Sequence, residues 1–203
     1  GSRQGNRKAT ATEICVTVET TAQHEALIQS LMDPSRWPEG GVDRQRIDTH
    51  ISTVILAGSF AYKLKKPLDL GFLDFFTIEA RHRACVEELR LNRRLAPQVY
   101  DAVCAITGSI ARPTIDGTGE VIDWAVRMRR FDPDAILSKL MHRVDAGLIE
   151  SLAKRVARFH AETTLCGPGE NFGSPEAVYR PMQENLEQIK ARAPQFADRI
   201  GHL

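Results

Sequence analysis

The chain has 203 residues and lacks the features that mark a secreted, zinc-binding or membrane protein. No apolar run approaches the roughly 20 residues of a transmembrane helix, and no apolar segment follows the basic start as it would in a signal peptide. There is no Cys-x-x-Cys pair and no cluster of cysteine with histidine, which argues against a zinc site. We therefore expect a cytoplasmic protein whose cysteines are free thiols, namely Cys15, Cys85, Cys104 and Cys166.

A strong imbalance of charge is also missing. Lysine and arginine total 27, aspartate and glutamate total 26, and aromatic residues make up only 6% of the chain. A nucleic-acid-binding surface needs a basic patch with interleaved aromatic side chains, so no nucleic-acid partner is expected. The hydrophobic fraction of 42% is sufficient for a buried core.

Hydrophobic periodicity and turn signals predict an α+β chain. Helices are expected at about 20–32, 77–95, 135–142, 146–163 and 181–193. Strands are expected at about 42–49, 50–57, 60–66, 102–106 and 121–128. An antiparallel sheet with one long helix inserted after its third strand would thus precede a helical portion. Residues 1–19 read as a disordered arm with a tag remnant at its start.

The stretch from Ile51 to Pro67 predicts two strands joined by a tight turn. Side chains alternate between the faces of a strand, so Lys63 and Lys65 share one face while Tyr62 and Leu64 can be buried on the other. One interpretation is an edge strand whose lysines discourage pairing with another chain. The other is a lysine that a rigid strand presents to a phosphate.

The long helix offers a carboxylate that could hold such a lysine. Glu88 falls on one helix face with Ala84, Leu91 and Leu95, an otherwise apolar stripe. Its neighbour Glu87 lies among arginines on a face that should be solvated. Glu88 is therefore expected to point inward and to pair with Lys63, although local pairing at the border of the stripe stays open.

Several segments together resemble a bacterial family of aminoglycoside-phosphotransferase-like kinases. The likeness covers roughly residues 20–165. It rests on Thr49-His50-Ile51-Ser52, Ala61-Tyr62-Lys63-Leu64-Lys65-Lys66-Pro67, Gly71-Phe72-Leu73-Asp74-Phe75, Glu87-Glu88-Leu89-Arg90-Leu91-Asn92-Arg93-Arg94-Leu95-Ala96-Pro97, Val126-Arg127-Met128-Arg129-Arg130-Phe131 and Ala157-Arg158-Phe159-His160-Ala161. Members of this family often carry a P-loop ATPase or kinase domain behind the kinase-like one.

The resemblance implies a protein-kinase-like small lobe over residues 20–131 and the incomplete start of a helical large lobe over 132–203. In that fold a strand lysine binds the ATP phosphates and pairs with a helix glutamate. Lys63 would take the lysine's place, with Lys65 as the fallback, and Glu88 would be the glutamate. Met128 would begin the hinge that contacts the adenine through backbone atoms.

The chain departs from the family pattern in three ways. No glycine-rich loop precedes the hairpin, so the segment Ile47-Asp48-Thr49-His50 would have to cover the phosphates instead. The Thr49 and Ser52 hydroxyls could take part, and the alternative is that these residues only close a turn. The run Asp69-Leu70-Gly71 resembles the metal-binding Asp-Phe-Gly but precedes the long helix, where that motif does not belong. No histidine is followed by aspartate within two positions, so the catalytic loop is missing.

The implied function is therefore the nucleotide-side portion of a small-molecule kinase that uses ATP with magnesium. Its acceptor is unknown, its catalytic loop would lie beyond this chain, and whether the chain alone is an enzyme stays undecided. The alternative is a non-catalytic module that binds a nucleotide or a partner and regulates an attached P-loop domain. A truncated large lobe would expose apolar surface, so a homodimer is also expected.

Overall fold

A computed structural model describes residues 17–37, 44–165, 167 and 173–196. The chain divides into two compact units, residues 1–150 and 151–203. The first unit carries a six-stranded antiparallel sheet with the order β1-β2-β3-β6-β4-β5. The strands are β1 (Gln45–Asp48), β2 (Ser52–Ala57), β3 (Phe60–Lys65), β4 (Tyr100–Ser109), β5 (Arg112–Ile115) and β6 (Val121–Arg129). The predicted α+β class is confirmed.

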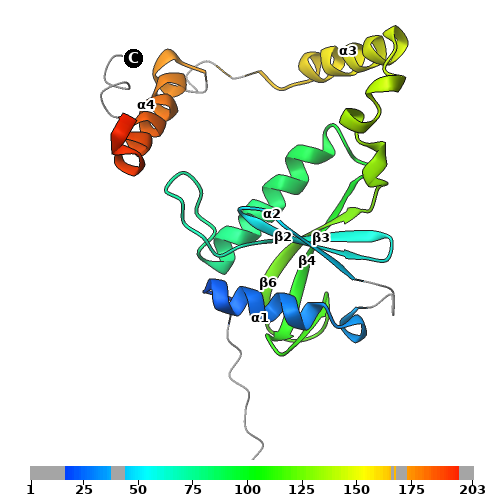
Figure 1. Ribbon diagram of the computed structural model, residues 1–203, viewed down its shortest axis with the longest axis vertical. Coiled ribbons are helices and arrows are strands. Elements are labelled where there is room, and N and C mark those ends of the chain that lie inside the picture. Colours follow the sequence, from blue (N-terminus) through cyan, green and yellow to red (C-terminus); the bar gives the residue numbers. More distant parts are fainter. Residues whose placement is uncertain (1–16, 38–43, 166, 168–172, 197–203) are drawn as a thin grey trace, which may run out of the picture. The chain divides into compact units, whose positions relative to one another are not determined.

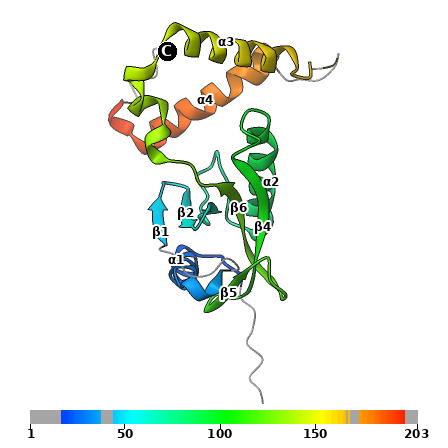
Figure 2. The same cartoon turned by 90° about the vertical axis from the view of Figure 1, so that its right-hand side faces the viewer.

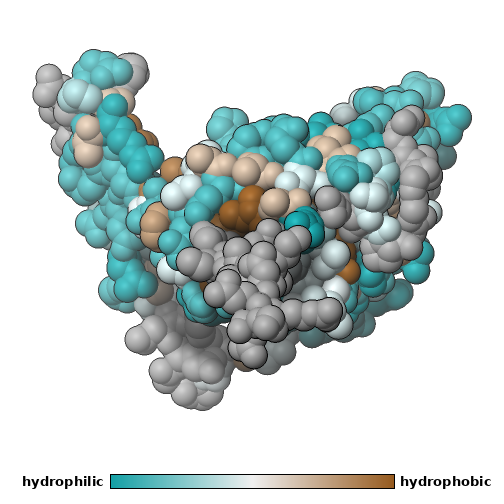
Figure 3. Space-filling view, turned by 90° about the horizontal axis from the view of Figure 1, so that it is seen from below, coloured by the Kyte–Doolittle hydropathy of each residue, from teal (hydrophilic) through white to brown (hydrophobic). Residues whose placement is uncertain are grey.

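Helix α1 (Thr21–Leu31) covers one face of this sheet (Figures 1 and 2). Thr20 begins the helix with a capping box, in which its hydroxyl accepts from the Gln23 backbone and the Gln23 side chain accepts from the Thr20 backbone. Leucine and isoleucine side chains of α1 enter a core with Tyr62 and Leu64, which are 2% and 0% exposed. Where the residues on the side of α1 are coloured in Figure 3, hydrophilic surface predominates and a hydrophobic area lies near the centre.

Helix α2 (Ile78–Arg93) lies against the other face of the sheet and packs on β4 and β6. Thr77 caps it by accepting a hydrogen bond from the Ala80 N–H at 3.1 Å, as its sequence predicts. The buried positions of the helix are Ala80, Arg81 and Cys85. The face that meets the sheet is thus narrow and includes a charged residue.

The predicted hairpin of β2 and β3 is confirmed. Gly58 adopts a φ of 57° between the two strands, in the left-handed region that glycine favours. The loop that follows β3 is also ordered by its own backbone. Phe75 N donates to the Leu68 carbonyl at 2.8 Å, and Asp69 accepts from the Gly71 N–H at 2.8 Å. The Asp69 carboxylate is therefore part of a local turn.

Four expectations about the elements need correction. Strand β5 was not predicted, because it is a four-residue edge strand that contains Pro113. Residues 135–142 form short 3₁₀ turns rather than one helix. Helix α4 (Pro175–Arg192) begins six residues earlier than position 181 and includes Pro181. The predicted arm ends before Val18, which is fully buried and donates to the Ile122 carbonyl at 3.2 Å.

Helix α3 (Ala146–Ala161) confirms the predicted amphipathic segment. Its apolar residues Leu148, Ile149, Leu152 and Val156 are between 39% and 49% exposed. None of the helices in the described part of the chain combines the length and apolar character that a membrane crossing requires. The lobe boundary predicted at residue 131 remains a prediction.

Candidate functional site

Lys63 and Glu88 form an ion pair between β3 and α2. The Lys63 Nζ lies 2.8 Å from Oε1 of Glu88. Their side chains are 26% and 12% exposed, so the pair is partly screened from water. The expectation that Glu88 points inward toward the hairpin lysine is confirmed, and Glu87 instead pairs with Arg90 on the surface.

Lys65 approaches the same carboxylate from the next position on that face of β3. Its Nζ contacts the other oxygen, Oε2 of Glu88, and its side chain is 5% exposed. The ammonium also lies over the ring of Phe75, 5.4 Å from the ring centroid. The sequence suggested Lys65 only as a substitute for Lys63, whereas both lysines hold Glu88 at once.

The apolar stripe of α2, from which Glu88 was predicted to point inward, is only partly buried. Ala84 is half-buried, but Leu91 and Leu95 are 47% and 42% exposed. Residues 90–95 are exposed, although Arg93 at the end of α2 still donates to the carbonyls of Tyr100 and Asp101 on β4. Glu88 therefore lies near the border of the buried face, and the two lysines account for its orientation.

The cluster of Lys63, Lys65 and Glu88 contains two ammonium groups and one carboxylate. Burial by itself raises the pKa of Glu88, but the hydrogen bonds and charges of the two lysines lower it further, so the net pKa lies below its ordinary value. Glu88 is thus ionised at neutral pH, and the cluster keeps one surplus positive charge. Such a cluster favours the approach of an anion.

A hollow of about 360 Å³ opens beside this cluster on the same face of the sheet. One wall is a row of paired residues across four strands, namely Gln45, Leu56, Ala61 and Met128. The opposite wall comes from the chain after β6 and includes Phe131 and Ile136, which are 59% and 44% exposed. Exposed large apolar side chains around a hollow are typical of a ligand site.

The sheet register relates this hollow to the lysines. Ala61 lines the hollow, and Lys63 is two residues further along β3 on the same face. Two residues of a strand span about 7 Å. Lys63 pairs with Val54 of β2, and Val54 pairs in turn with Ile47 of β1. Ile47 also lines the hollow. The apolar hollow and the cationic cluster are therefore adjacent parts of one surface.

The predicted hinge lies at this hollow. Met128 lines it, as do Arg129 and Arg130. The N–H groups of Arg129 and Arg130 already donate to the carbonyls of Val99 and Ser59, at 2.7 and 2.8 Å. Backbone hydrogen bonds to a bound base would therefore come from Phe131 or from carbonyl oxygens.

Thr49 and Ser52 do not line this site. The Thr49 hydroxyl donates to the Ser52 carbonyl at 2.9 Å and accepts from the Ser52 N–H at 3.0 Å. Ser52 is fully buried. Of the two interpretations of these residues, these hydrogen bonds support turn closure. A contact of the buried Ser52 hydroxyl with phosphate stays an untested prediction.

Tyr100 is a neighbour of the cluster that sequence patterns did not indicate. It begins β4 and pairs with Met128 of the hollow's wall. Burial, and then the nearby Glu88 carboxylate, raise the pKa of its phenol. A single tyrosine at the start of a strand carries no spacing signal, so only the register of β4 with β6 reveals it.

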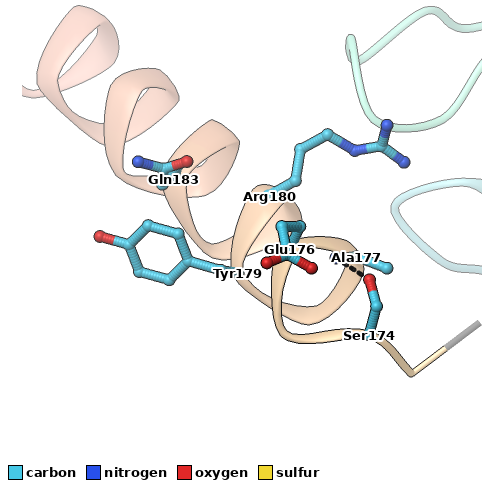
Figure 4. Close-up of a pocket in the computed structure, with 6 residues that line it drawn as sticks. All are labelled: Ser174, Glu176, Ala177, Tyr179, Arg180 and Gln183. Atoms are coloured by element: carbon cyan, nitrogen blue, oxygen red, sulfur yellow. Dashed lines mark hydrogen bonds between the residues drawn. The ribbon is translucent and has the colours of Figure 1, made fainter. Parts of the chain in front are cut away.

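A second hollow lies at the start of α4, in the other unit. Ser174, Glu176, Ala177, Tyr179, Arg180 and Gln183 line it (Figure 4). Ser174 caps the helix by accepting from the Ala177 N–H at 3.1 Å. This hollow contains none of the predicted site residues. Nowhere in the described ranges do three or more His, Cys, Asp or Glu side chains form a group suited to a metal ion.

Comparison with known proteins finds longer relatives. The chain is 34% identical over 166 residues to an uncharacterized protein of Mycobacterium bovis and to uncharacterized proteins of two Mycobacterium tuberculosis strains. The match covers 77% of this chain but only 31% of each relative. The chain thus spans less than a third of the length of these curated relatives. No family model and no solved structure matches it.

Proposed function

We propose that this chain forms the nucleotide-binding portion of a kinase-like phosphotransferase. The single observation that carries the proposal is the adjacency of an apolar hollow and a cluster with surplus positive charge on one sheet face. A nucleoside triphosphate has the matching chemistry, a flat base joined to a chain of anionic phosphates. The resemblance to a kinase-like small lobe supports the same interpretation of the sheet and α2.

In this proposal the base enters the hollow between Ala61, Met128 and Phe131. Lys63 contacts the phosphates, because it is the more exposed of the two lysines at Glu88. A lysine held by a strand and a carboxylate is a pre-organised ligand for phosphate oxygens. The residues that would transfer the phosphoryl group to an unidentified hydroxyl acceptor belong to another part of a longer protein.

Magnesium accompanies ATP in such enzymes. The described residues present no suitable group of ligands for it, so the proposal assigns the ion to no residue here. A non-catalytic module that binds nucleotide and regulates an attached domain is the second candidate.

The proposal is tested by titrating ATP, with and without magnesium, into the wild-type protein and into Lys63→Ala. We expect affinity to fall by about tenfold or more, because a charge-assisted contact to phosphate is lost. Lys66→Ala is the matched control, since Lys66 donates to the Thr49 carbonyl at 2.7 Å instead of to Glu88. Equal ATP affinity of wild type and Lys63→Ala would remove Lys63 from the site.

Phosphoryl transfer separates the two candidates. The full-length protein with Lys63 intact should consume ATP in the presence of its acceptor if it is a kinase. Under the second candidate, ATP binds to this portion without turnover there, and Lys63→Ala changes the activity of the attached domain instead.

A further inference from the structure

The two lysines at Glu88 differ in how firmly they are held. Lys65 is 5% exposed, contacts Oε2 of Glu88 and lies over the Phe75 ring. Phe75 is itself 6% exposed. Lys63 is 26% exposed, and no second carboxylate of the described residues lies within ion-pair distance of it. Lys65 is therefore enclosed, while Lys63 has access to solvent and lies two residues along β3 from Ala61, which lines the hollow.

A single lysine at this position could not pair with Glu88 and with a phosphate at the same time. Removing one partner of a partly buried ion pair leaves an uncompensated charge, which is strongly unfavourable. If Lys63 alone neutralised Glu88, an arriving phosphate could recruit Lys63 only by leaving that carboxylate without a cation. A second cation that stays at Glu88 keeps the carboxylate paired when Lys63 moves to the phosphate.

We propose that Lys65 is a positioning residue that keeps Glu88 paired while Lys63 turns its hydrogen bonds from Glu88 to a bound phosphate. This inference rests on the proposed function, because it needs a phosphate at Lys63. Lys65 touches no ligand in this scheme. It acts through Glu88, each of whose carboxylate oxygens holds a different lysine.

A double-mutant cycle distinguishes this role from a general effect of charge. Lys65→Met should weaken ATP binding by about tenfold or more, because Lys63 is then the cation left to hold Glu88. In a Glu88→Gln background the same substitution should weaken binding by less than about threefold, since no carboxylate competes for Lys63. Both affinities are measured by calorimetric titration of ATP at fixed ionic strength.

Lys66→Met provides the matched control for this cycle. It removes the same charge from the next residue, which pairs with Asp48 at 3.3 Å. Its effect on ATP affinity should be equal in the wild-type and Glu88→Gln backgrounds. Equal effects of Lys65→Met in the two backgrounds would mean that Lys65 acts only through long-range charge, and would overturn the inference.

Two further measurements test the inference even if Lys65→Met fails to fold. Lys65→Arg keeps the cation and should keep ATP affinity within about threefold of wild type. In wild-type protein carrying ¹³C-labelled lysine, ATP should shift the Cε resonance of Lys63 more than that of Lys65. A larger shift at Lys65 would overturn the inference without any substitution at that position.

The outcomes also separate this inference from the proposed function. If Lys63→Ala binds ATP as tightly as wild type, the proposed function fails. If Lys63→Ala loses affinity but the cycle of Lys65 with Glu88 is additive, only the positioning role fails.

Discussion

Arg81 of α2 donates from Nε to Oδ1 of Asp123 on β6 at 2.7 Å, and both side chains are fully buried. The same guanidinium donates to the carbonyls of Val18, Phe75 and Phe76. One side chain therefore ties α2 to the sheet, to the segment before α1 and to the loop that carries Phe75. Because Phe75 lies against Lys65, this pair also supports the candidate site from behind.

Removal of either partner of the Arg81–Asp123 pair should destabilise the protein. Arg81→Met and Asp123→Asn should each lower the free energy of unfolding by about 3–5 kcal/mol, because the partner remains buried without its counter-charge. The double variant should lose less free energy of unfolding than the two single variants lose together. Urea unfolding at pH 7 measures these differences.

The exposed pair of Glu87 with Arg90 is the control for this prediction. Both side chains are more than half exposed, so Glu87→Gln should leave the unfolding midpoint unchanged. A midpoint for Arg81→Met as high as that of Glu87→Gln would show that the buried pair contributes no net stability.

Buried His24 should make stability depend on pH. Its Nε2 lies 3.1 Å from the Thr53 hydroxyl, which donates to Asp48 at 2.8 Å. Burial, with the nearby positive charges of Lys66, Arg81 and Arg46, lowers the pKa of His24 to about 4. The unfolded chain therefore binds the proton more readily between about pH 6.5 and pH 4, and acidification through this window destabilises the fold.

His24→Gln isolates this effect. When the pH falls from 7 to 5, the free energy of unfolding should fall by about 2 kcal/mol more in the wild type than in the variant. Asp123 acts in the opposite direction, since burial raises its pKa to about 6 and its protonated form favours the fold as pH falls. Because Asp123 is present in both proteins, the difference between them reports His24, and equal losses would contradict the assignment.

The two cysteines within the described residues should be unreactive while the protein is folded. Cys85 and Cys104 are fully buried, and burial raises the pKa of each thiol to about 12. Cys15 and Cys166 lie outside the described residues and are replaced by serine in the protein used for the test. Labelling with a disulfide reagent should then need global unfolding, and rapid labelling in native buffer would contradict the prediction.

Filling the hollow should separate binding of the base from binding of the phosphates. Ala61→Leu places a larger side chain in the row that lines the hollow. ATP affinity should fall by about tenfold or more, whereas tripolyphosphate, which has no base, should bind Ala61→Leu as it binds wild type. Titration of both ligands measures this, and an equal loss for the two would place the base elsewhere.

The sequence predicted the parts of the fold that depend on local periodicity. The hairpin, α2 and its Thr77 cap, and the pairing of Lys63 with Glu88 follow from alternation along a strand and from helix spacing. Strand β5 was missed, because a short edge strand with a proline has no such signal. The start of α4 was predicted too late, because proline is unfavourable inside a helix and the prediction placed Pro181 at its first position.

The least predictable features join segments that are distant in sequence. Arg81 and Asp123 are separated by 42 positions, and a single buried arginine on a charged helix looks like a surface residue. The hollow beside Lys63 could not be anticipated either. It depends on the register that places Leu56, Ala61 and Met128 in one row across β2, β3 and β6.

The strand order also has a consequence for how the protein is made. β3 lies between β2 and β6, yet roughly 60 residues separate the end of β3 from the end of β6. At a synthesis rate of 5–20 residues per second, the hairpin waits about 3–12 s for its second neighbour. During that time the lysines of β3 discourage its open edge from pairing with other nascent chains.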